Sequence, residues 1–187
     1  MQGRWVLSGG LASGKSAVRR LLEDSGISTI DADTIGHQVL ELAGPAHALV
    51  AETWPAVVTG DAIDRGALAG IVFNDPSELA RLESITHPFI FEVIRRRVEV
   101  VDGPVVVEVP VLGHGLGDDW GLMVVDCSDE IRLQRARERG MDEADARARM
   151  ASQPSRTEWL AAADLVVPNH GSLDDLKATV GLLVGQL

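Results

Sequence analysis

The sequence predicts an α/β protein of three layers, in which helices cover both faces of a five-stranded parallel sheet. Five short runs rich in β-branched residues are nearly continuously apolar, as is typical of strands buried on both faces. Helix-compatible stretches separate these runs, as the crossovers of a parallel sheet require. The expected strands cover residues 4–8, 28–31, 104–109, 122–127 and 165–167.

Length and composition narrow the class of protein. The 187 residues suffice for one α/β domain with its own core. No apolar run approaches the roughly 18 residues that a membrane span needs, so we expect no membrane association. The net charge of -11 argues against nonspecific binding to nucleic acid. Cys127 is the only cysteine, which excludes an internal disulfide and suits a reducing cytoplasm, where we expect the protein.

A glycine-rich stretch follows the first expected strand. Residues 9–16 read G-G-L-A-S-G-K-S and fit the phosphate-binding pattern G-x-x-x-x-G-K-[ST]. The apolar run before it and the helix-compatible run after it disfavour a chance match. In this context Lys15 reaches the β- and γ-phosphates, and the Ser16 hydroxyl can bind Mg²⁺. The residues expected to bind the nucleotide are Gly10, Leu11, Ala12, Ser13, Gly14, Lys15, Ser16 and Ala17.

The segment between the second and third expected strands is long. About 70 residues separate the two runs, which is far more than a simple crossover needs. We expect helices over residues 66–73, 76–84 and 88–101, with Pro88 at the first position of the last one. Residues 34–101 are therefore a candidate helical insertion that binds a second substrate. Extra packing without a binding role is the alternative.

A second irregular region follows the fourth expected strand. Residues 131–153 carry six arginines in a helix–Gly140–helix pattern. A functional interpretation makes residues 132–153 a mobile lid that brings arginines onto a transferring phosphoryl group. The interspersed carboxylates are equally compatible with an ordinary charged surface.

Carboxylates lie where the expected strands end, which is the edge that faces the ligand in a parallel sheet. Asp31 and Asp33 would share one side if the extended conformation continued beyond the second strand. One could then orient a metal-bound water or an arginine, and the other could act as a base. Asp33 could also cap a helix that starts at Thr34. Glu108 and Asp126, at the ends of the third and fourth expected strands, are weaker candidates for a role at the site. Glu108 could lie behind the metal, but a carboxylate at a strand end can equally have a structural role.

Two further polar positions are open to more than one interpretation. His87 precedes Pro88 and could cap or pack a turn, or it could contact a ligand. Asn169, His170 and Gly171 follow the fifth expected strand. A turn there could hold an adenine edge, or it could reflect the turn preference of Asn and Gly alone.

Taken together, these motifs resemble the dephospho-coenzyme A kinase family over nearly the whole chain. The resemblance is carried by residues 7–16, residues 30–33, Asp64-Arg65 with Leu68 and Phe73, residues 82–88, residues 109–112, Arg139, Arg149 with Gln153, and residues 163–171. Many kinases share the phosphate loop. The D-A-D after the second strand, the H-P pair and the A-D…N-x-G ending are more specific.

The resemblance implies a P-loop kinase fold in one domain, residues 1–187, with a nucleotide core, a helical acceptor-binding insertion and a lid. It implies phosphorylation of the ribose 3′-hydroxyl of dephospho-coenzyme A by ATP with Mg²⁺, giving coenzyme A in the last step of its biosynthesis. By matching position, the resemblance implies that Asp33 is the base and that Lys15 and Ser16 serve the phosphates and Mg²⁺. It implies that Arg139, as a catalytic residue, and Arg149 come from the lid. It also implies that Arg65 and His87 line the acceptor side and that Asn169 and Gly171 lie by the adenine.

The resemblance departs from the family pattern at two places. Ala12 stands where the family usually has glycine, a small change that we expect the fold to tolerate. Residues 111–114 read V-L-G-H where the family reads L-L-x-E, so the glutamate is missing at His114.

Two other classes of function stay open. Another small P-loop kinase would act on a nucleoside, a nucleotide or a shikimate-like metabolite, and the insertion with Asp33 and His87 argues against it. A GTP-dependent switch is disfavoured because the chain has no N-K-x-D guanine signature. A catalytically silent module would bind ATP without turnover.

Overall fold

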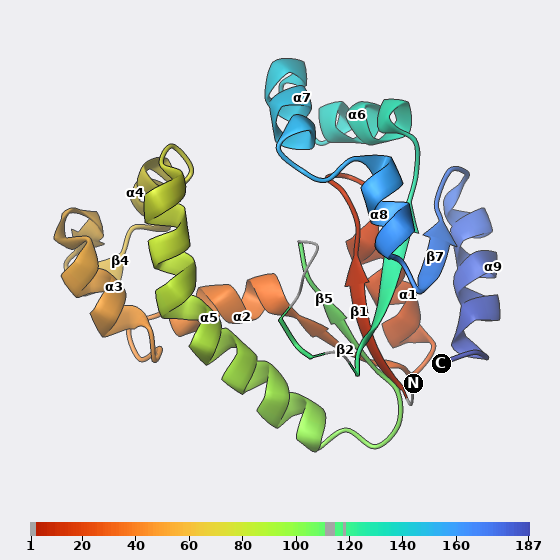
Figure 1. Cartoon of the computed structure of the whole chain (residues 1–187), viewed down its shortest axis with the longest axis horizontal. Coiled ribbons are helices and arrows are strands. Elements are labelled where there is room, and N and C mark those ends of the chain that lie inside the picture. The colour runs from red at the N-terminus through yellow and green to blue at the C-terminus, as the bar shows by residue number, and fades with distance from the viewer. Residues whose placement is uncertain (1–2, 111–114, 118) are drawn as a thin grey trace. The chain divides into compact units, whose positions relative to one another are not determined.

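The chain folds into two compact units. The computed structural model describes residues 3–110, 115–117 and 119–187. One unit consists of Met1–Asp31 with Val101–Leu187, and the other is Ala32–Val100. The first unit carries the parallel sheet and the glycine-rich loop, and the second is helical apart from one small hairpin (Figure 1). The second unit spans nearly the same residues as the candidate insertion at 34–101.

The sheet of the first unit has the strand order β2-β5-β1-β6-β7, and every pairing is parallel. Its strands are β1 Arg4–Ser8, β2 Ser28–Asp31, β5 Val105–Glu108, β6 Gly121–Asp126 and β7 Leu165–Pro168. All five predicted strands are confirmed, with ends that move by one residue at most. Because β1 is the central strand, the loop that follows it leaves the middle of the sheet edge where ligands bind in such folds.

Helices of the first unit cover the sheet and extend beyond it. α1 (Lys15–Asp24) and α9 (Leu173–Val184) pack together on one face, and α8 (Arg156–Ala162) packs against β6. The buried core on the α1 and α9 face includes Leu7, Val18, Leu22, Val106, Met123, Leu176 and Val180. α6 (Asp129–Glu138) and α7 (Glu143–Ala151) lie beyond the carboxyl ends of the strands (Figure 1). The turn at Gly140 separates them, so the predicted helix–Gly140–helix pattern is confirmed.

The second unit is built around its longest helix. Its elements are α2 Ala32–Val39, α3 His47–Thr53, the 3₁₀ turn η1 Pro55–Val57, β3 Val58–Thr59, β4 Ala62–Ile63, α4 Arg65–Val72 and α5 Pro76–Glu99. α2, α3 and α4 all pack against α5. The antiparallel β3–β4 hairpin was not predicted, because strands of two residues are too short to show an alternating pattern.

α5 corrects the prediction of separate helices at 76–84 and 88–101. It runs without interruption through Pro88, which lies inside the helix rather than at its start. A proline there removes one backbone hydrogen bond and favours a break. The helix continues because buried residues on both sides of Pro88, among them Thr86 and Ile94, hold it in one packed core. α5 has 24 residues, yet neither it nor any other described helix is long and apolar enough to cross a membrane.

Candidate active site

The glycine-rich loop connects the central strand to the start of α1. Gly14 precedes α1 with a φ of 105°, a left-handed conformation that favours glycine. A Cβ at Gly14 would also overlap Nδ2 of Asn169. The first turn of α1 has no acidic residue, whereas those of α6, α7 and α9 each contain two. No side-chain carboxylate therefore neutralises the positive end of the α1 dipole, which can attract an anion.

Lys15 and Ser16 occupy the positions expected of residues that serve the phosphates and a cation. Lys15 Nζ donates to the carbonyl oxygens of Gly9 at 2.8 Å and Gly10 at 3.4 Å, so its ammonium group lies over the loop. Ser16 Oγ donates to Glu108 Oε1 at 2.9 Å. Within the described ranges, no three His, Cys, Asp or Glu side chains form a metal cluster. The hydroxyl and carboxylate oxygens at this site fit Mg²⁺, which usually takes one or two protein ligands plus phosphates and water.

Arg19 fixes the position of Glu108. Its Nε donates to Glu108 Oε2 at 2.8 Å, and its Nη1 and Nη2 lie 2.6 Å from Glu23 and 3.7 Å from Asp31. Only 18% of the Arg19 side chain and 10% of the Glu108 side chain are exposed. Arg19 belongs to none of the motifs from which the site residues were predicted. Its one local signal is its spacing, because it follows Lys15 by four residues and so shares a face of α1.

Arg132 ties α6 and the segment after α7 to the loop. Its Nε donates to the Leu11 carbonyl at 2.9 Å, and its Nη2 donates to Gln153 Oε1 at 3.0 Å. The Leu11 N–H donates to the same Gln153 oxygen at 2.7 Å. Arg132 is 4% exposed, so these bonds are shielded from water. Its side chain supports the loop and is not a free cation at the surface.

Ala12, which stands where the family usually has glycine, affects both the backbone conformation and the packing of the loop. Its φ of 56° is left-handed, which costs an L-residue about 1–2 kcal/mol. Its methyl group is buried in a cluster with Ala136 of α6 and Ala146 of α7. Burial of a methyl group contributes roughly 0.8 kcal/mol and offsets part of that strain. The predicted lid region thus packs on the loop, while its mobility stays a prediction.

Asn169 supports the loop from the end of β7. Its Nδ2 donates to the Ser13 carbonyl at 2.7 Å, and its Oδ1 accepts from Arg135 Nη2 at 3.3 Å. Arg135 Nη1 also donates to the Ser13 carbonyl, at 3.3 Å. Asn169 is 6% exposed and Gly171 lies just before α9. The predicted adenine contact of these two residues stays a prediction, and the buried amide of Asn169 has a structural role that the sequence analysis missed.

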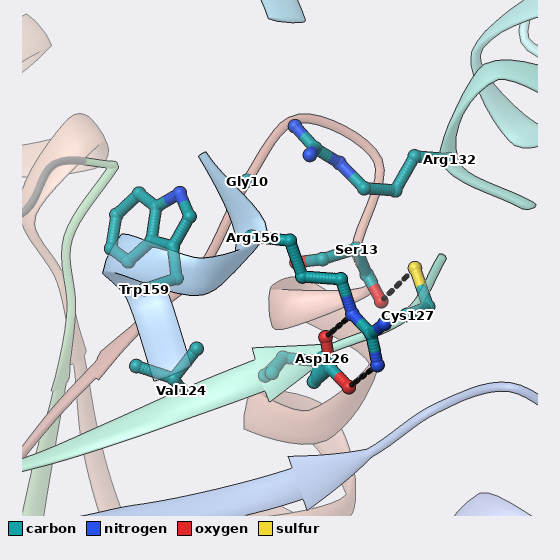
Figure 2. Close-up of a pocket in the computed structure, with 9 residues that line it drawn as sticks. Gly10, Ser13, Val124, Asp126, Cys127, Arg132, Arg156 and Trp159 are labelled. Atoms are coloured by element: carbon teal, nitrogen blue, oxygen red, sulfur yellow. Dashed lines mark hydrogen bonds and ion pairs between the residues drawn. The ribbon is translucent and has the colours of Figure 1, made fainter. Parts of the chain in front are cut away.

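A small pocket lies beneath the loop (Figure 2). Asp126 accepts two hydrogen bonds from Arg156, at 2.7 and 2.8 Å, and lies 3.2 Å from His170 Nε2. The hydrogen bonds from Arg156 hold the pKa of Asp126 below its usual range. Burial raises the pKa of the neighbouring Cys127 thiol, which favours its unreactive protonated form. The pocket volume is about 10 Å³, which is too small for a nucleotide base.

Arg139 and Arg149 differ from the other arginines of α6 and α7. Arg137 and Arg147 both pair with Glu143, at 3.2 and 2.9 Å. Arg139 is the C-cap residue that follows α6 and Arg149 lies in the last turn of α7, and both are exposed. Neither guanidinium forms an ion pair within the part of the chain that the structure describes. Both are therefore available to an anionic ligand.

Asp33 lies in the second unit, in the first turn of α2. The extended backbone stops at Asp31, so the alternation that would put Asp31 and Asp33 on one side of a strand does not apply. The helix begins at Ala32, so the interpretation of Asp33 as its N-cap is also wrong. Asp31 instead pairs with Arg19, whereas Asp33 is exposed on α2.

Arg65 and His87 lie on different helices of the second unit. Arg65 is the first residue of α4, after the N-cap Asp64, and it lines a cavity of about 310 Å³. His87 lies inside α5, with its ring 5.5 Å from that of Phe91, so its interpretation as a cap or turn residue is wrong. The predicted contact of both residues with the acceptor stays a prediction. The missing glutamate falls at His114, which is outside the described residues.

A phosphate loop with its lysine and serine, on the central strand of a parallel sheet, defines a P-loop protein that binds nucleoside triphosphates. Two solved structures share the whole fold of this chain. A protein from Thermus thermophilus, TT1252, is 29% identical with a TM-score of 0.86, and the match covers 100% of this chain and 99% of that one. A dephospho-CoA kinase from Campylobacter jejuni has a TM-score of 0.75 at 24% identity, covering 100% and 97% of the two chains.

Comparison with proteins of similar sequence identifies the family within this class. The dephospho-CoA kinase family model matches residues 5–175. A dephospho-CoA kinase from Streptomyces avermitilis is 42% identical over 182 residues, which cover 94% of this chain and 89% of the relative. The chain belongs to the dephospho-CoA kinase family, and both the predicted family and the predicted fold class are confirmed.

Proposed function

We propose that this chain transfers the γ-phosphoryl group of ATP to the ribose 3′-hydroxyl of dephospho-coenzyme A, giving ADP and coenzyme A. The observation that carries this proposal is the assembled phosphate loop, in which Lys15 lies over the loop and Ser16 faces Glu108. The family match over residues 5–175 supports the choice of acceptor. We place the reaction in the cytoplasm, which the free thiol of Cys127 suits.

The donor side rests on the loop and its supports. Backbone N–H groups at the start of α1 bind the β- and γ-phosphates, and Lys15 adds a point charge. Ser16, with Glu108 behind it, would hold Mg²⁺, which neutralises charge on the phosphate oxygens when bound. Bonds from Asn169 and Arg132 keep the loop in the shape that ligand binding needs. This preorganisation lowers the reorganisation that catalysis requires.

The acceptor side rests on Asp33. Its carboxylate accepts the proton of the 3′-hydroxyl while the hydroxyl oxygen forms a bond to the γ-phosphorus. The bond between that phosphorus and the β,γ-bridging oxygen breaks, and ADP leaves with the electron pair. Arg139 and Arg149 balance the negative charge on the transferring group, because both are exposed and belong to the helices that pack on the loop.

An ADP-release assay coupled to NADH oxidation tests the proposal. Dephospho-coenzyme A, adenosine, AMP and shikimate are compared as acceptors at one ATP concentration. We expect dephospho-coenzyme A to give the highest kcat/KM. Turnover that is absent with dephospho-coenzyme A, or faster with shikimate, would refute the proposed acceptor.

Substitution of Asp33 by asparagine tests its role as the base. We expect kcat to fall by about 10²–10⁴, the usual contribution of general base catalysis, with the ATP dissociation constant unchanged. Lys15→Ala is the contrasting variant, because it should weaken ATP binding as well as turnover. If Asp33→Asn kept most of the wild-type kcat, Asp33 would not be the base.

A further inference from the structure

The second unit contains an open cavity that the donor site does not use. Its volume is about 310 Å³, at the lower end of the range of small-molecule sites. The walls come from the end of α2, the residues after it, β4 and the start of α4. The side chains that line it include His37, Leu40, Glu41, Leu42, Ile63 and Arg65.

The lining of the cavity combines a wall of aliphatic side chains with a few polar side chains. Leu40, Leu42 and Ile63 supply the apolar wall, and Leu42 is 65% exposed. Arg65 supplies a guanidinium that forms no ion pair with any residue that the structure describes. His37 and Glu41 can exchange hydrogen bonds with amide groups. Such a site suits a ligand with an anionic end and a partly apolar chain that contains amides.

The cavity begins one helical turn from the proposed base. Asp33 and His37 are four residues apart on α2, so they lie on the same face, separated by about 6 Å along the helix axis. Both side chains are exposed. When the 3′-hydroxyl of an acceptor contacts Asp33, the remaining atoms of the acceptor can therefore reach the cavity.

We propose that this cavity binds the pantetheine arm of dephospho-coenzyme A, with Arg65 against the diphosphate where the arm begins. The inference rests on the proposed function. The arm carries a dimethyl group that fits Leu40, Leu42 and Ile63. It also carries two amides, which match His37 and Glu41. The diphosphate joins the arm to the ribose, and the guanidinium of Arg65, which lines the same cavity as the apolar wall, is the group we assign to it.

A cavity of similar size on α6 and α7 fits the arm less well. Its volume is about 360 Å³, and its walls include the carboxylates of Asp129 and Glu130. Arg147, which also lines it, already pairs with Glu143. Two carboxylates repel a diphosphate, and an arginine that is already paired gives little compensation. The cavity of the second unit is the better match in both charge and apolar lining.

Leu42→Glu tests the assignment, with Leu49→Glu as the matched control. Both leucines are exposed in the second unit, at 65% and 46%, but Leu49 lies on α3 and does not line the cavity. Substitution at such exposed positions usually changes stability little. We expect Leu42→Glu to raise the KM for dephospho-coenzyme A about 10-fold or more, the usual effect of a lost apolar contact, with kcat and the KM for ATP unchanged. Leu49→Glu should leave all three constants unchanged.

A titration without turnover separates this inference from the proposed function. Calorimetry with 4′-phosphopantetheine, which is the arm with one phosphate and without AMP, should show binding to the wild-type protein and to Leu49→Glu. Binding to Leu42→Glu should be about 10-fold weaker. No binding to the wild-type protein, or equal binding to Leu42→Glu, would overturn the assignment. Failure to phosphorylate dephospho-coenzyme A would instead overturn the proposed function.

Discussion

Glu108→Gln removes the negative charge beside Ser16 and Arg19 but keeps the shape of the side chain. Ser16 Oγ can still donate to the amide oxygen, whereas Arg19 loses the charged partner that lies 2.8 Å away. Breaking a fully buried ion pair costs about 3–5 kcal/mol, and an exposed pair contributes about 0–1 kcal/mol. Glu108 is 10% exposed and Arg19 keeps Glu23 and Asp31. We therefore expect the substitution to lower the free energy of unfolding by about 1–3 kcal/mol, the cost of a lost charged hydrogen bond.

Urea denaturation followed by circular dichroism measures this change, with Glu23→Gln as the control. For an m-value of about 2 kcal/mol/M, a loss of about 2 kcal/mol lowers the midpoint by about 1 M. Glu23 lies closer to the same arginine, at 2.6 Å, but it is 41% exposed. Its loss should therefore cost under about 1 kcal/mol. If Glu23→Gln proved as destabilising as Glu108→Gln, burial would not decide the strength of these pairs.

Two further substitutions test the supports of the loop. Gly14→Ala places a Cβ on Nδ2 of Asn169 at a φ of 105°, so we expect a titration with a fluorescent ATP analogue to show strongly weakened binding. Gly26→Ala is its control, because its φ is also positive but its surroundings are open, and equal loss of binding in both would refute the reasoning. Arg156→Ala should raise the pKa of Asp126 toward its usual range, because the wild-type pKa is held down by the hydrogen bonds from Arg156. A carboxylate with a lowered folded-state pKa stabilises the protein above its unfolded pKa of about 3.9, and this contribution disappears as the pH falls through the folded-state pKa. The wild-type advantage in urea midpoint should thus be full at pH 7 and shrink below about pH 4, and an advantage that grew with acid would contradict the assignment.

Local patterns in the sequence predicted the sheet and the donor loop. A buried parallel strand is apolar at almost every position, so a run such as Val105–Glu108 can be recognised without knowledge of its neighbours. The glycine loop has a fixed spacing because its backbone must wrap a phosphate group. Both signals depend on consecutive residues. For this reason the strand positions and the roles expected of Lys15 and Ser16 could be proposed from the sequence alone.

Features that depend on distant residues could not be predicted. Proline normally marks a helix start, but Pro88 lies inside α5 because the packed core of the second unit outweighs the lost hydrogen bond. Arg156 lies 30 residues from Asp126, and Arg132 lies 121 residues from Leu11. No local spacing encodes such pairs. The sequence analysis could therefore list the arginines of residues 131–153 but could not tell Arg132, which braces the loop, from Arg139, which is exposed.

The position of the new phosphate on the product shows whether this chain phosphorylates the ribose 3′-hydroxyl. ATP, Mg²⁺ and dephospho-coenzyme A are incubated with the protein, and the product is analysed by mass spectrometry and phosphorus NMR. We expect one added phosphate, seen as a monoester on the ribose 3′-oxygen, and almost none of this product with Asp33→Asn. ADP formation without that ester, or a phosphate on the 2′-oxygen instead, would contradict the proposed function.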